Sequence, residues 1–184
     1  GDVYKRQFIN TFVSQNLGAG SPENGPRYAW AGVWGSLVVW IAVLVPMAFL
    51  MPLVFGLVHD NDVLVAHESD YARILLLGGV LTLFGRTMHH YFFGLHRPKI
   101  ITLSAIVGNV ANLGMNYVLI FGEEGMPVLG LPGVPGVPAL GLRGAAIATV
   151  IGTAVEVVIP FAVFIGPRMN AELATRRAWR PAAK

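Results

Sequence analysis

The longest run of the chain without a charged side chain covers residues 28–59, between Arg27 and Asp60. It exceeds the roughly 20 apolar residues that cross a bilayer core about 30 Å thick. Over the whole chain, 54% of residues are hydrophobic and only 12% are charged, which is about half the charged share of a typical soluble domain. Because so few charges cannot cover a soluble fold, we predict an all-α integral membrane protein, a polytopic helix bundle.

Other apolar stretches repeat this pattern, and together they predict four membrane-spanning helices. These are expected at residues 28–58, 72–96, 99–122 and 144–166. Residues 8–17 are apolar but too short to span, so we interpret them as the end of an earlier helix. The polar leader 1–7 lacks a starting Met and is interpreted as non-native.

Residues 123–143 are also apolar, but we do not expect them to cross the membrane. They are rich in glycine and proline, and such a backbone cannot satisfy its own hydrogen bonds in lipid. An outer loop with turn or polyproline character is predicted. Residues 167–184 are predicted to be a cytoplasmic linker.

Basic residues predict the orientation, because cytoplasmic loops carry an excess of Lys and Arg. We predict that the protein lies in the plasma (inner) membrane. The cytoplasmic segments are then residues 18–28, 95–99 and 167–184. The cytoplasmic side then holds Arg27, Arg97, Lys99, Arg168, Arg176, Arg177, Arg180 and Lys184, against Arg73 and Arg143 outside. The opposite orientation would reverse this excess.

Three asparagines form a polar stripe on the predicted helix 99–122. Asn109, Asn112 and Asn116 follow at i, i+3 and i+7, so at about 100° per residue they share one face. Amides on a membrane helix need partners. They either hydrogen-bond to neighbouring helices or line a polar cavity that binds an ion or a substrate.

Glu156 is the one charged residue of the predicted helix 144–166. Thr149, Thr153 and Pro160 share its face, at i−7, i−3 and i+4. A carboxylate inside a membrane is disfavoured unless it is paired, and Pro160 removes the amide donor that the Glu156 carbonyl would normally receive. The group either exchanges protons or binds a cation, or it serves as a structural hydrogen-bond partner between helices.

Arg86, His89 and His90 interrupt the predicted helix 72–96. A proton relay or a metal site is conceivable, but adjacent histidines diverge by about 100° on a helix. We favour Arg86 extending to the membrane surface with interfacial histidines beside it. No catalytic constellation, metal site or cofactor is predicted, and the chain has no cysteine. The small net charge of +3 does not point to nucleic acid.

Four motifs in order resemble the multidrug and toxic compound extrusion (MATE) transporter family. The first is a helix end and Gly-Ala-Gly turn, TFVSQNLGAG at residues 11–20. The others are FFGLHRP at 92–98, GNVANLGMNYVLIFG at 108–122 and ALGLRGAAIATVIG at 139–152. Within them, the family-motif residues with a structural role are Gln15, Gly18, Gly20, Pro98 and Gly122.

The resemblance implies a transporter with two six-helix lobes around a central cavity. Such proteins export cationic, amphipathic compounds in exchange for Na⁺ or H⁺. This chain would hold the end of helix 2 and helices 3 to 6 of the first lobe, and helix 1 and the second lobe would lie elsewhere in the protein. Asn112 and Asn116 match a cation-site pair on helix 5, with Asn116 where some members carry Asp. Thr149 lies near the matching region of helix 6.

The predicted function is therefore a secondary antiporter and not an enzyme. Its partners would be a small cationic substrate, the lipid bilayer and the remainder of its own chain. One alternative is a lipid-linked sugar flippase of related fold, which calls for a strongly basic cavity lined by several Arg. Arg86 is the only basic residue away from the ends of the predicted spans, which argues against it. The other is a non-transporting membrane scaffold, in which the asparagine stripe would be packed and dry.

Overall fold

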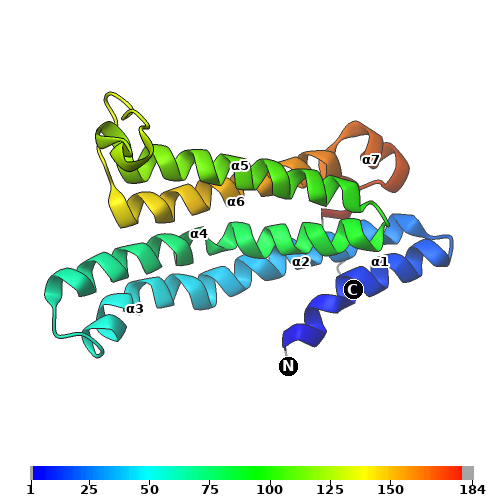
Figure 1. The fold of residues 1–184 in the computed structure, drawn as a ribbon. Coiled ribbons are helices and arrows are strands. Elements are labelled where there is room, and N and C mark those ends of the chain that lie inside the picture. The colour runs from blue at the N-terminus through cyan, green and yellow to red at the C-terminus, as the bar shows by residue number, and fades with distance from the viewer. Residues whose placement is uncertain (1, 180–184) are drawn as a thin grey trace. The chain divides into compact units, whose positions relative to one another are not determined.

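The computed structural model describes the backbone of residues 2–179 and the side chains of residues 9–179. Apart from an isolated bridge between Met126 and Leu131, regular structure in this part is helical, which confirms the predicted all-α class (Figure 1). In chain order the elements are α1 (Asp2–Gly18), the short η1 (Pro22–Asn24), α2 (Gly25–Val39), the π segment η2 (Trp40–Leu44), α3 (Val45–Gly56), α4 (Asp62–Gly94), α5 (Pro98–Phe121), η3 (Gly122–Glu124), η4 (Pro127–Leu129), α6 (Gly141–Ile165), α7 (Pro167–Leu173) and η5 (Arg177–Trp179).

Among the described residues, three helical stretches are long and apolar enough to cross a membrane. They are Pro22–Gly56, Pro98–Glu124 and Gly141–Ile165. Their surfaces carry exposed apolar side chains such as Val110, which is 66% exposed, and Leu113, which is 73% exposed. Lipid accepts such a surface at no hydrophobic penalty, whereas water does not. The helix α4 is long but falls outside this group, so its predicted span at 72–96 stays a prediction.

The predicted helix 28–58 contains a π segment ahead of its first proline. The amide of Val45 donates to the Trp40 carbonyl, an i to i+5 bond that closes η2. Pro46 lies directly after this turn and has no amide to donate. The irregularity precedes Pro46, because the turn before a missing donor is the one that must rearrange.

The helix α4 begins well before the predicted residue 72. The side chain of Asn61 accepts hydrogen bonds from the amides of Val63 and Leu64, at 3.0 and 3.2 Å. This is an N-terminal cap, which satisfies donors that a helix start leaves unpaired. The acidic stretch after Asn61, which lies outside the predicted bounds 72–96, is therefore the first part of a 33-residue helix.

The chain divides into two compact units. The first holds residues 2–38, 82–106 and 156–179, and the second holds Val39–Leu81 and Val107–Val155. The core of the first unit is aromatic: the Tyr91 ring lies edge-on to Phe164, with centroids 5.0 Å apart, and both side chains are fully buried. Val13 from α1 joins this core beside Gly94, where an added Cβ would lie 2.8 Å from the Val13 side chain.

Part of the predicted linker 167–184 is folded onto the first unit. We name residues 166–179 the docked segment. Its Met169 and Leu173 are buried in the aromatic core, and α7 contacts η1. Trp30 on α2 donates its indole N–H to the carbonyl of Thr175 at 2.8 Å, and Arg97 pairs with Glu172 at 2.8 Å. That residues 167–184 are a cytoplasmic linker stays a prediction; residues 180–184 lie outside the described part.

In the second unit, glycines allow the helices to pack closely. A Cβ on Gly144 would collide with the Leu119 carbonyl of α5, and one on Gly152 would lie 2.6 Å from the Asn112 Cβ. The glycine-rich segment after α5 folds back on itself: the Glu123 amide donates to the Val137 carbonyl at 2.8 Å. That residues 123–143 form an outer loop of the membrane protein stays a prediction.

Candidate functional site

The predicted site residues fall in both units, and the asparagine pair of α5 lies in the second. Asn116 donates its amide N–H to the side-chain oxygen of Asn112 at 3.0 Å, within the same helix. Both residues are half-buried. The sequence left open whether the amides bond to neighbouring helices, and this bond is instead an i to i+4 pair along α5.

The helix α6 approaches this pair at its own polar stretch. Gly152 packs against Asn112, and Thr149 lies on the same face of α6, three residues earlier. The hydroxyls of Thr149 and Thr153 donate to the carbonyls of Ala145 and Thr149, at 2.9 and 2.8 Å. Their oxygens can still accept a donor or bind a cation, because a hydroxyl carries two lone pairs.

The chemistry of this cluster is that of neutral oxygen ligands. Asparagine carbonyls and threonine hydroxyls are the ligand type that hard cations accept. Asn109, the third member of the stripe, is exposed. No group of three or more His, Cys, Asp or Glu side chains that could hold a metal ion occurs in the described residues. The cluster could therefore bind a small cation only through uncharged oxygens, with water or further ligands.

Glu156 lies in the first unit and is paired with a residue that the sequence did not link to it. The Oε1 atom of Glu156 is 3.3 Å from the Nε2 atom of His89. Sequence reasoning assigned His89 to the membrane interface, because contacts between separate helices are not visible along the chain. The sequence could have suggested the pair through their similar depth in the membrane. At 1.5 Å per residue, both residues lie within about 15 Å of the predicted inner ends of their helices.

The family-motif residues occupy turns and helix ends. The carbonyl of Gln15 accepts the amide of Ala19 at 2.9 Å at the end of α1, and Gly18 is its last residue. Gly20 and Gly122 have φ angles of +73° and +47°, a region that glycine adopts without steric penalty. Pro98 begins α5, the helix position where a missing amide is tolerated.

Comparison with known proteins decides the family. The MatE family matches residues 9–118, more than half of the chain. The chain belongs to the MatE family. The match includes the asparagine stripe of α5 and His89, whereas Thr149, Thr153 and Glu156 lie beyond its end. This membership and the apolar helices establish a multi-pass membrane protein.

Several relatives of this MatE chain are named as drug-resistance proteins. The chain is 28% identical over 130 residues to "Probable multidrug resistance protein NorM" of Neisseria meningitidis. It is 29% identical over 123 residues to "Multidrug resistance protein MdtK" of Klebsiella pneumoniae. Each match covers 66% of this chain and 27% of the relative, so the chain spans about a quarter of these relatives' length. No solved structure matches the chain significantly.

Proposed function

We propose that the protein to which this chain belongs is a secondary antiporter that exports cationic, amphipathic compounds in exchange for Na⁺ or H⁺. The similarity to NorM and MdtK, both named multidrug resistance proteins, supports drug efflux. The observation that carries the site is the Asn112–Asn116 pair, packed against Gly152 in apolar helices. An antiporter would use such a polar group to bind an ion or a substrate within the membrane.

In this proposal the chain forms part of one lobe. Asn109, Asn112, Asn116, Thr149, Thr153 and Glu156 face the transport pathway, and ion binding biases which side of the membrane the pathway opens to. Residues 18–28, 95–99 and 167–184 lie in the cytoplasm, in line with the excess of basic residues there. No observation favours a sugar flippase or a scaffold over the antiporter.

The test is efflux of a cationic fluorescent dye from liposomes that contain the full-length protein. An imposed Na⁺ or H⁺ gradient should drive efflux by the unmodified protein. Asn116→Ala removes the donor to Asn112, and loss of one hydrogen bond of about 1.4 kcal/mol predicts about tenfold weaker binding of the coupled ion. Asn116→Asp adds a carboxylate and should change the relative efficacy of the two gradients.

The matched control is Asn16→Ala. Asn16 is an asparagine whose side chain donates to the Phe12 carbonyl of α1, away from the proposed site residues in sequence, and its removal should leave dye efflux unchanged. Absence of gradient-driven efflux by the unmodified protein would refute the antiporter. Equal efflux by Asn116→Ala and the unmodified protein, over all ion concentrations, would refute the assignment of the site.

A further inference from the structure

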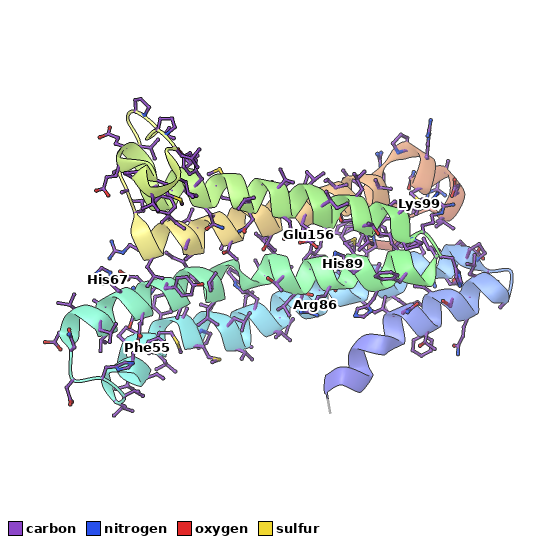
Figure 2. All side chains as sticks on the ribbon, viewed as in Figure 1. Phe55, His67, Arg86, His89, Lys99 and Glu156 are labelled. Atoms are coloured by element: carbon purple, nitrogen blue, oxygen red, sulfur yellow. The ribbon has the colours of Figure 1, made fainter. Side chains whose placement is uncertain are left out.

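The His89–Glu156 contact is a polar pair inside the first unit that the asparagine site does not include. The two side chains come from α4 and α6 and lie near each other in Figure 2. Their Nε2 and Oε1 atoms are 3.3 Å apart, and the side chains are 27% and 28% exposed. The Nε2 atom is buried and makes no aligned hydrogen bond within the described residues. The Nε2 atom is therefore close enough to Oε1 for an ion pair, but the two atoms are not aligned as a hydrogen bond.

Apolar packing surrounds this pair on the helices that carry it. Gly85 brings α4 against α6, since a Cβ there would lie 2.8 Å from the side chain of Val157, itself 4% exposed. Farther along, the rings of Phe84 and Phe161 pack edge-to-face at 5.0 Å. Apolar surfaces of this kind do not stabilise a charge, and the imidazole 3.3 Å away offers the carboxylate a polar partner.

The other ionisable groups of the first unit come from each of its elements. On α4 the neighbours are the exposed Arg86, three residues before His89, together with His90 and Tyr91. On α6 there is none besides Glu156 between residues 144 and 165. Residues 9–38 contribute Glu23 in η1 and Arg27 and Tyr28 in α2, the turn between α4 and α5 contributes His96 and Arg97, and α5 contributes Lys99 in its first turn. The docked segment carries Arg168, Glu172, Arg176 and Arg177.

We propose that His89 and Glu156 together form an intramembrane proton-binding site, separate from the asparagine cluster of the second unit. The pair takes up one proton from water, which lies on Nε2 and is shared toward Oε1, and the charge of the pair changes from −1 to zero. Release returns the same proton to water, and no other bond forms or breaks. The role of the site in ion coupling rests on the proposed antiporter function, but proton binding by the pair does not.

The donor set identifies the ligand as a proton and not a sodium ion. Sodium takes oxygen ligands, and an imidazole nitrogen is a poor ligand for a hard cation. Histidine is the side chain whose ordinary titration falls between about pH 5 and pH 8. The helix around Glu156 is also weakened: Pro160 has no amide to donate to the Glu156 carbonyl. A change in the charge of the pair can therefore alter α6 where its backbone resists least.

Infrared difference spectroscopy of the full-length protein in lipid tests the site directly. Spectra recorded between about pH 5 and about pH 8 report protonation of imidazoles, and subtracting the spectra of His89→Gln isolates the signal of His89. In Glu156→Gln the proton affinity of His89 should fall by about tenfold or more, because the neighbouring carboxylate that favours the charged imidazole is lost. The matched control, His90→Gln, should leave it unchanged, because the next residue on the helix points about 100° away.

Two outcomes would overturn the proposal. If His89 titrates identically in the unmodified protein and in Glu156→Gln, the two groups do not share a proton site. If His90→Gln shifts the titration of His89 as much as Glu156→Gln does, the effect is not specific to the pair. Glu172→Gln, which removes the exposed partner of Arg97, serves as the control for loss of an unrelated carboxylate.

Dye efflux then separates this inference from the proposed function. If a proton gradient drives efflux, Glu156→Gln and His89→Gln should flatten the pH dependence of that efflux. Unchanged pH dependence in both variants would remove the pair from coupling and leave the antiporter intact. If the unmodified protein moves no dye but the infrared coupling is present, the antiporter fails and the proton site stands.

Discussion

Replacing Gly152 with alanine should separate α5 from α6 at the asparagine pair. A Cβ at this position would lie 2.6 Å from the Asn112 Cβ and 3.0 Å from the Gly108 carbonyl oxygen. Non-bonded carbons prefer about 3.5–4.0 Å, so the two helices must move apart by about 1 Å. Neither obstacle is the end of a flexible side chain, and only a shift of the backbone can relieve the collision.

The size of the effect follows from overpacking. Adding a methyl group to a packed contact that cannot relax costs about 1–3 kcal/mol. The matched control is Gly114→Ala on α5, where a Cβ meets nothing within 4 Å. There alanine gains up to about 1 kcal/mol of helix propensity. Gly152→Ala gains the same helix propensity, so the stabilities of the two variants should differ by the overpacking cost alone, about 1–3 kcal/mol.

The measurement is unfolding of each purified variant in mixed micelles with increasing denaturing detergent, followed by tryptophan fluorescence. Gly152→Ala should unfold at a lower detergent fraction than the unmodified protein, and Gly114→Ala at an equal or higher one. The proposed function adds a second expectation: Gly152→Ala, but not Gly114→Ala, should impair dye efflux, because it displaces Asn112. Equal stability of the two variants would refute the close approach of α5 and α6 on which the site is built.

Two further predictions concern the docked segment and the start of α4. Trp30→Phe keeps an aromatic ring but removes the donor to the Thr175 carbonyl, at a cost of about 1 kcal/mol. Trypsin should then cleave after Arg176 about fivefold faster, measured by gel assay. The control Trp40→Phe, whose indole bonds within the second unit, should not change the cleavage rate. Equal rates in the two variants would mean that the Trp30 hydrogen bond does not hold the docked segment in place. Asn61→Ala should lower the stability of α4 by about 1 kcal/mol, which faster amide hydrogen exchange at its first turn would show. Asn61→Asp can still cap the helix and should leave the exchange unchanged. The same exchange rate in both variants would contradict the cap.

Features with local causes could be predicted from the sequence alone. A charge-free run such as residues 28–59 must be a membrane helix, because both its length and its lack of polar groups are properties of the run itself. The same holds for the glycine- and proline-rich loop after Gly122. Even here the boundary of α4 was placed too late, since a single capping residue, Asn61, extends the helix into an acidic stretch.

The polar residues of the site were found by the sequence, but their partners were not. Spacing places Asn112 and Asn116 on one face, yet it cannot tell a bond along α5 from a bond to another helix. Glu156 stood out as a charge in lipid, while His89 appeared to be an ordinary interfacial residue until the structure placed its ring 3.3 Å from that carboxylate.

The sequence by itself determined that this is an all-helical membrane chain of the MatE type, and it located the apolar helices and the polar groups that they carry. Hydropathy, glycine and proline act over a few residues, so their consequences can be read along the chain. Only the tertiary structure decided that Glu156 meets His89, that Gly152 meets Asn112 and that residues 166–179 are docked. Such contacts depend on how helices far apart in the sequence pack, and packing is a property of the folded unit and not of any one segment.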